Sequence, residues 1–341
     1  MRKMLCTVGF LVAFTTAALG GAILAQPENR RGEEQTFLTF PEWFLVFSPA
    51  EYADFVRSHS PDEFVFWGHI KQFWQSYAAV AAESHARGNP ANPGYHLMIM
   101  VIGTSTTIEY SIRSAYEILV GRLAALTASA PTEEDQYGAR AAQEYVDFIR
   151  YRPWYEFDFT SRLSGLWSQT SWFGANNLRK WERKYALTTE YGVKAMYGKL
   201  IQLATRSIYE TPREITSVAV ASWPICESDV ATVEVMMTSE SATLLAIPRY
   251  EGFRVPMVAL ARCGAEFQEI AGNRTVILLS TVHAIGGAQL DDSKLILRQP
   301  ILTVPGRERT VYEVPVSQLA ADLRRLDAAA PEVEIEHIFD Y

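Results

Sequence analysis

The segment Thr275-Val-Ile-Leu-Leu-Ser-Thr-Val282 decides the fold class of this chain. Its residues are mostly β-branched or aliphatic and show no helical spacing, a pattern that predicts a strand. A Gly272-Asn273 turn precedes the segment, and a further strand is expected just before that turn, at Phe267 to Ile270. The pattern therefore predicts a β-sheet in the C-terminal part of the chain.

Helices and strands alternate on both sides of this segment. Before it, we expect a strand at 243–247 and a helix at 256–262 that Gly264 ends. After it, we expect a helix at 317–329 and a strand at 333–339. The resulting order is βαββαβ, which resembles the ferredoxin-like split βαβ arrangement.

Further strands are expected around this unit. Residues 215–220 form a β-branched run, and Val233, Val235 and Met237 alternate with polar neighbours. The 287–314 stretch is long for a ferredoxin-like fold and is expected to hold an extra hairpin. We predict an α+β chain whose ferredoxin-like domain, with extra strands, covers residues 211–341.

Aromatic residues mark a second domain before residue 211. Seven of the eight Trp and 13 of the 16 Tyr lie between Phe37 and Glu210. Thr132-Glu-Glu-Asp135 is a capping-box-like helix start. Apolar residues recur at helical spacing in three stripes: Ile108, Ile112, Tyr116, Leu119 and Leu123; Ala139, Ala142, Val146 and Ile149; Val193, Met196, Leu200 and Leu203. We predict an aromatic-rich helical domain at 37–210.

Two segments of this helical domain bear on membranes. The uncharged run Leu97 to Ile108 is too short to span a bilayer, and we expect it to be a buried core helix rather than a re-entrant piece. Basic residues at 179, 180, 183 and 184 surround Trp181 and could lie on anionic head groups. We favour a solvated charged face beside a core stripe of Leu178, Trp181 and Tyr185.

The N-terminus has the layout of a targeting segment. Arg2 and Lys3 precede 22 uncharged residues, 4–25, and residues 26–36 form a linker. The length suits a transmembrane anchor, whereas the late glycines and the small residues Ala22 and Ala25 suit a cleaved signal peptide. Both alternatives place most of the chain across a membrane, either anchored and facing the extracytoplasmic side or secreted or periplasmic.

Composition excludes some function classes. The chain has 341 residues and a net charge of −8, so it lacks the basic surface with which proteins neutralise nucleic-acid phosphates. The length suggests about two domains. We expect no nucleic-acid partner, a membrane contact through the N-terminal segment, and an apolar ligand or a protein as the possible further partner.

Histidines gather in one part of the chain and suggest a metal site. Four of the six His lie between His59 and His96, yet none of these pairs has the i, i+3 or i, i+4 spacing of helical metal ligands. A metal or haem site would therefore have to be assembled across helices. The candidate ligands are His69, His96 and Glu109.

Two cysteines lie outside the targeting segment. Cys226 and Cys263 can form one disulfide in an oxidising compartment, or remain two buried thiols, since a domain of this size does not need a bridge.

No sequence motif names a reaction or a cofactor. The chain contains no G-x-S-x-G, P-loop or G-x-G-x-x-G pattern. We predict a membrane-anchored or exported, non-enzymatic protein that binds an apolar ligand, a lipid or a protein partner. The alternative is an extracytoplasmic metal- or haem-dependent enzyme that uses His69, His96 and Glu109.

Overall fold

A computed structural model describes residues 40–87, 93–206, 215–221, 233–240, 242–248, 250–287, 290 and 293–339. The predicted targeting segment at 1–25, the linker at 26–36, Cys226 and the domain boundary at 210–211 lie outside these residues. The disulfide to Cys263 therefore stays a prediction.

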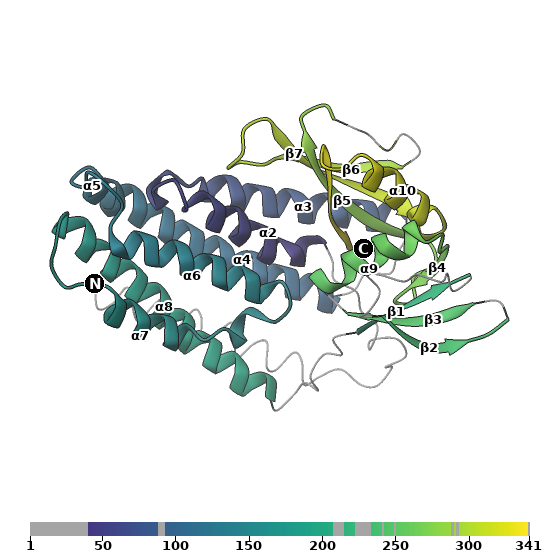
Figure 1. Cartoon of the computed structure of the whole chain (residues 1–341), viewed down its shortest axis with the longest axis horizontal. Helices are drawn as coiled ribbons and strands as arrows, with labels where there is room; N and C mark the ends of the chain where they lie inside the picture. The colour runs from purple at the N-terminus through teal and green to yellow at the C-terminus, as the bar shows by residue number, and fades with distance from the viewer. Residues whose placement is uncertain are drawn as a thin grey trace.

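The chain is α+β, as predicted, with helices gathered at one end and antiparallel sheets at the other (Figure 1). The helical part contains α2 (Phe40–Phe55), α3 (Phe66–Ala86), α4 (Pro93–Tyr116), α5 (Arg122–Ala125), α6 (Glu133–Ile149), α7 (Phe159–Gln169) and α8 (Asn177–Arg206). Short helical turns lie at Pro61–Glu63 and Trp154–Glu156, and a π-helical turn at Glu117–Gly121 joins α4 to α5. The predicted capping box forms at the start of α6, where Thr132 Oγ1 accepts a hydrogen bond from the Asp135 backbone N–H.

The second part contains two four-stranded sheets and two helices. Its elements are β1 (Ile215–Val220), β2 (Glu234–Thr238), β3 (Thr243–Pro248), α9 (Glu251–Arg262), β4 (Phe267–Ile270), β5 (Val276–Ala284), β6 (Lys294–Pro300), β7 (Arg307–Pro315), α10 (Val316–Ala328) and β8 (Val333–Phe339). The extra hairpin expected within 287–314 is present as β6 and β7. α9 begins at Glu251, earlier than the expected start at Pro256.

These elements form an internal structural repeat. One sheet has the strand order β2-β3-β1-β4 and the other β6-β7-β5-β8, and every strand pair is antiparallel. Each sheet is thus built from a β-β-β-α-β unit whose first strand lies between its third and its fourth. Pro248 and Pro315 end the third strand of their units, and a helix follows each. The same topology occurs twice in succession.

This arrangement does not confirm the ferredoxin-like assignment. The six predicted elements are present in the expected order, but β3 and β4 belong to one sheet while β5 and β8 pair in the other. A ferredoxin-like domain would unite its strands in one sheet. The difference arises because β1 lies between β3 and β4, and β7 lies beside β5.

Strand β5 joins the sheets to the helical part. Its alternating side chains contact two separate cores, as the period of two in a strand requires. Ile277 and Leu279 pack in the core that α9 and α10 share with both sheets. Leu278 points to the other side and packs against aromatic residues of α2 and α3, among them Phe44 and Phe73. The sheet β6-β7-β5-β8 is therefore covered on both faces.

The expectation of a transmembrane helix needs correction. Within the part of the chain that the structure describes, every helix is too short or too polar to cross a bilayer.

Two glycines in the helical part make a matched test of packing. A Cβ at Gly103 of α4 would collide with the rings of Phe73 and Trp74 of α3, whereas Gly192 of α8 has open space. We expect Gly103→Ala to lower the free energy of unfolding by about 1–3 kcal/mol through overpacking. Gly192→Ala should raise it by about 0.5–1 kcal/mol because alanine favours helix. Urea denaturation of both variants checks this, and equal effects would contradict the α3–α4 packing.

Candidate functional site

Helix α8 is turned opposite to the sequence-based prediction. The side chains of Arg179, Lys180, Arg183 and Lys184 are almost fully buried. Leu178 and Tyr185, expected in the core, are each 63% exposed, and Trp181 is 36% exposed. The predicted solvated charged face is therefore wrong. The alternative, in which these four cations lie on lipid head groups, is wrong for the same reason.

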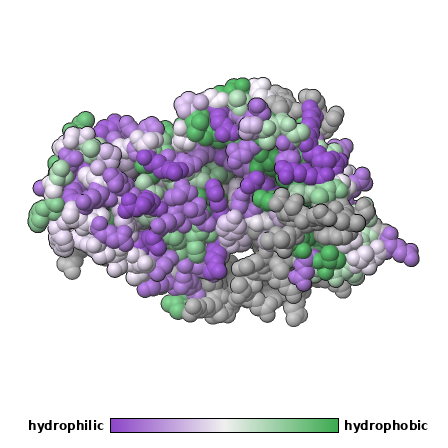
Figure 2. Space-filling view, viewed as in Figure 1, coloured by the Kyte–Doolittle hydropathy of each residue, from purple (hydrophilic) through white to green (hydrophobic). Residues whose placement is uncertain are grey.

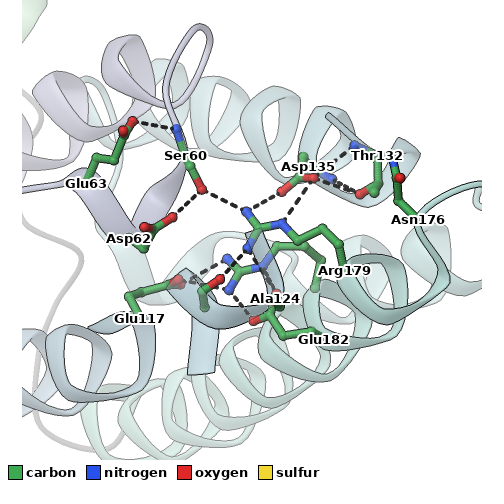
Figure 3. Close-up of polar contacts among 12 residues, drawn as sticks. Ser60, Asp62, Glu63, Glu117, Ala124, Thr132, Asp135, Asn176, Arg179 and Glu182 are labelled. Carbon is green, nitrogen blue, oxygen red and sulfur yellow. Dashed lines mark hydrogen bonds and ion pairs between the residues drawn. The ribbon is translucent and has the colours of Figure 1, made fainter. Parts of the chain in front are cut away.

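Arg179 links three segments of the helical part (Figure 3). Its Nη2 donates to Asp135 Oδ1 at 2.8 Å and to Ser60 Oγ at 2.9 Å. Its Nη1 donates to the Gly121 carbonyl at 3.2 Å. One guanidinium thereby connects the start of α6, the turn before Pro61 and the π-helical turn.

Arg183 makes the most regular ion pair of this group. Its Nη1 and Nη2 each donate to one oxygen of Glu117 at 2.9 Å, the bidentate geometry that guanidinium favours. Glu182 accepts from Arg183 Nε at 2.7 Å and from Arg179 Nη1 at 3.1 Å. Burial lowers the pKa of Arg183, but Glu182 and Glu117 outweigh it and the net shift is upward.

The two lysines share one carboxylate. Glu134 has no exposed surface and accepts from Lys180 Nζ at 2.9 Å, while Lys184 Nζ lies 3.1 Å from the same oxygen. Glu133 adds a contact to Lys180 at the surface. The full buried network consists of Glu117, Glu134, Asp135, Arg179, Lys180, Glu182, Arg183 and Lys184, four cations with four carboxylates. Charge balance is what allows so many ions to leave water together.

A local change in the helix lets Glu117 enter this network. The π-helical turn at 117–121 follows α4 directly, and such turns redirect side chains at functional positions. A Cβ at Gly121 would collide with the Glu117 carboxylate and lie 3.3 Å from Arg183 Nη2. A side chain at 121 would therefore displace the Glu117 carboxylate from its present position beside Arg183.

A second group of charges bridges α4 and α8. Glu109 and Arg113 of α4 meet Glu190 and Lys194 of α8, and we name these four residues the α4–α8 seam. Lys194 Nζ lies 3.1 Å from Glu109 and 2.9 Å from Glu190. Burial raises the pKa of Glu190, but Arg113 and Lys194 outweigh it and lower the pKa to about 2.

With the charges inside, apolar side chains lie outside. We define the α4–α8 face by the exposed apolar residues on the outer side of these two helices and of α5. It comprises Leu97, Met100, Ile108, Ile112, Leu119, Leu123 and Leu126 on the run from α4 to the end of α5, and Leu178, Trp181, Tyr185, Val193, Met196, Leu200 and Leu203 on α8. The prediction that the run from Leu97 to Ile108 is core therefore holds for Ile99, which is fully buried, but not for most of its neighbours.

Both stripes lie on one side of the helical part. α4 and α8 are antiparallel, because Glu109 meets Lys194 whereas the later Glu117 meets the earlier Arg183. Successive residues are about 100° apart around a helix axis. On both helices the seam lies between the buried side and the apolar stripe, and the direction of rotation from the buried side to the stripe is the same. For antiparallel neighbours this places the two stripes side by side on the same face.

The surface over α2 and α6 has the opposite character. Figure 2 shows it as mostly hydrophilic, and α4 runs behind these two helices in Figure 1. Contiguous exposed apolar patches are typical of interaction sites in folded proteins.

The three candidate metal ligands lie apart and have different partners. His69 Nδ1 lies 2.9 Å from Ser48 Oγ, His96 Nδ1 lies 2.8 Å from Tyr77 Oη, and Glu109 belongs to the seam. His96 and Glu109 are separated by about 20 Å along α4 at 1.5 Å per residue. Among the described residues, no group of three His, Cys, Asp or Glu side chains could hold a metal ion.

His69 instead belongs to a closed polar junction between α2, α3 and the sheet. Ser48 Oγ contacts both His69 and Tyr110, and His69 Nε2 lies 3.7 Å from Glu51, which pairs with Arg309 at 3.0 Å. Burial and, to a lesser extent, Arg309 lower the pKa of His69 to about 3, so its ring is neutral. The contacts run from Ser48 to His69 to Glu51, the order of residue types in hydrolytic triads. Ser48 and His69, however, have no exposed surface for a substrate.

Sequence reasoning missed the buried carboxylates. One signal was present: Arg179 with Arg183, and Lys180 with Lys184, are two like-charge pairs at i, i+4. Such pairs repel on a solvated helix, so their occurrence together indicates carboxylate partners elsewhere in the fold.

Comparison of the chain with protein-family models, with curated proteins and with solved structures gives no match.

The buried network predicts a large effect of removing one carboxylate. Glu117→Ala would leave the Arg183 guanidinium with one fewer partner in the interior and should lower the free energy of unfolding by about 3–5 kcal/mol. The control is Arg57→Ala, which breaks the exposed pair with Asp54 and should change it by less than about 0.5 kcal/mol. Equal destabilisation in chemical denaturation would contradict the network.

The seam predicts a pH dependence. The pKa of Glu190 falls from 4.5 to about 2 on folding, so its stabilising effect is complete above pH 4.5 and is lost as the pH falls toward 2. The loss should reach at most about 3 kcal/mol. As the pH is lowered from 4.5 toward 2, the denaturant concentration at the unfolding midpoint should fall less steeply in Glu190→Gln than in wild type. Glu332→Gln, at an exposed position, should keep the wild-type slope.

Proposed function

We propose that this chain is a non-enzymatic protein, exported or associated with a membrane on the extracytoplasmic side, that binds an apolar ligand, a lipid or a protein partner through the α4–α8 face. The observation that carries the proposal is the orientation of α8, which buries four cations and exposes seven apolar side chains. Exposed apolar surface is costly in water, and a binding partner removes that cost.

The site chemistry supports binding rather than a reaction. Charged side chains of the buried network and of the seam are paired with one another, and those of the network have little exposed surface. The face itself offers aliphatic and aromatic groups, with small polar residues such as Thr104, Ser105 and Thr189 between them. A surface of this composition recognises apolar area and offers few groups for acid–base or nucleophilic steps.

An uncharged photoreactive probe tests this function. The full-length protein in mild detergent is labelled with an apolar diazirine and mapped by peptide mass spectrometry. Peptides covering 97–126 and 178–203 should carry several-fold more label than those covering α6, because the probe partitions onto exposed apolar area.

The matched variants are Ile112→Asp and Leu200→Asp, with Ile285→Asp as the control at an exposed apolar position in the turn after β5. The first two should lose label from their own peptides and the control should not change labelling of the face. Uniform labelling of wild type across its surface would refute the proposed function.

A further inference from the structure

We propose that the α4–α8 face is seated on the surface of a lipid bilayer, with α4 and α8 lying in the plane of the membrane. This inference rests on the proposed function and names the partner: the boundary between lipid head groups and acyl chains.

The shape of the face fits a planar partner. α4, the π-helical turn and α5 form a continuous run of 33 helical residues and α8 contains 30, so the face is about 45–50 Å long. Ion pairs of the seam and the rings of Tyr116 and Tyr185, 6.1 Å apart, bridge the two helices. Two long helices with apolar outer sides suit a bilayer, whose flat surface can contact them along their whole length.

The aromatic residues fit the head-group region. Trp172 and Phe173 are more than half exposed, in the turn just before α8. The Trp172 ring lies 5.7 Å from that of Trp181, and Tyr185 follows one turn later. Trp and Tyr concentrate where hydrocarbon meets water, because their rings are apolar and carry a polar N–H or O–H.

An exposed charge at the margin also fits. Helical spacing places Lys199 at the outer edge of the face, on the side of α8 away from α4, and its side chain is exposed. Cations beside an apolar surface attract anionic head groups, by about 1 kcal/mol each near the membrane.

The buried ions determine how deep the helices can lie. The seam lies between α4 and α8, beside the apolar stripes, and moving its charges into hydrocarbon would cost several kcal/mol. Helices of this kind bury one face by about 5–10 Å and remain in the interface. An in-plane orientation also agrees with the polarity of the described helices, none of which could span a bilayer.

The predicted targeting of the protein favours a membrane, rather than a second copy of the chain, as the partner of the α4–α8 face. Residues 4–25 have the pattern of a membrane-targeting segment. A chain delivered to or held at a membrane meets lipid at a far higher effective concentration than it meets another copy.

Quenching of tryptophan emission by brominated lipids tests whether the α4–α8 face contacts the membrane. Ile112→Trp and Leu200→Trp each add an indole to the face, and Ile285→Trp adds one to an exposed turn of the other part. The full-length variants are mixed with phosphatidylcholine and phosphatidylglycerol vesicles whose acyl chains carry bromine near the head group. The added emission at 112 and 200 should fall about twofold or more, because both positions would lie within ~5–10 Å of the boundary. Emission added at 285 should stay unchanged.

The local readout separates this contact from binding through the N-terminus, which would leave all three positions unquenched. Circular dichroism of each variant confirms that it is folded. Unquenched emission at 112 and 200, with photolabelling of the face retained, would overturn the lipid inference and leave the proposed function intact. Sedimentation showing a dimer that Ile112→Asp dissociates would overturn it in favour of a second copy. Loss of both quenching and labelling would refute both proposals.

Discussion

A cation that leaves water must meet a carboxylate, and α8 buries four cations within two turns. The carboxylates from other segments are Glu117 in the π-helical turn, and Glu134 and Asp135 in the first turn of α6. These contacts set the rotation of α8 about its axis. Once the charged side is directed inward, 3.6 residues per turn directs the apolar stripe outward. The exposed apolar face is thus a consequence of the buried ion pairs.

The two parts of the chain are joined by packing and by charge. Leu278 of β5 packs against α2 and α3, while Arg309 of β7 pairs with Glu51 of α2 and lies 3.8 Å over the ring of Phe47. Arg309 also pairs with Glu336 of β8 at 2.7 Å. The sheet therefore holds the helical part by its α2 and α3 side. α4 and α8 present their apolar stripes on the side away from the core, which leaves the face open.

Local features of the fold were predictable from sequence, and long-range ones were not. The strands at 267–270 and 333–339 and the Thr132 cap depend on neighbouring residues alone. The division into two sheets depends on β1 pairing with β3 and β4, which no local pattern reveals. α8 carries an apolar stripe and a charged stripe, and helical periodicity does not state which is buried. That choice depends on carboxylates more than 40 residues away. His69 and His96 were grouped by proximity in sequence, but they lie on different helices and have different partners.

Lysine reactivity measures the orientation of α8 most directly. Lys180 and Lys184 have side chains that are 3% and 1% exposed, whereas Lys199 on the same helix is exposed. Brief acetylation of the folded protein, followed by peptide mass spectrometry, should modify Lys199 at least about tenfold faster, since the reagent cannot reach a buried, ion-paired ammonium group. Equal rates at the three lysines would show that the charged side of α8 is solvated, and the account of the apolar face would then be wrong.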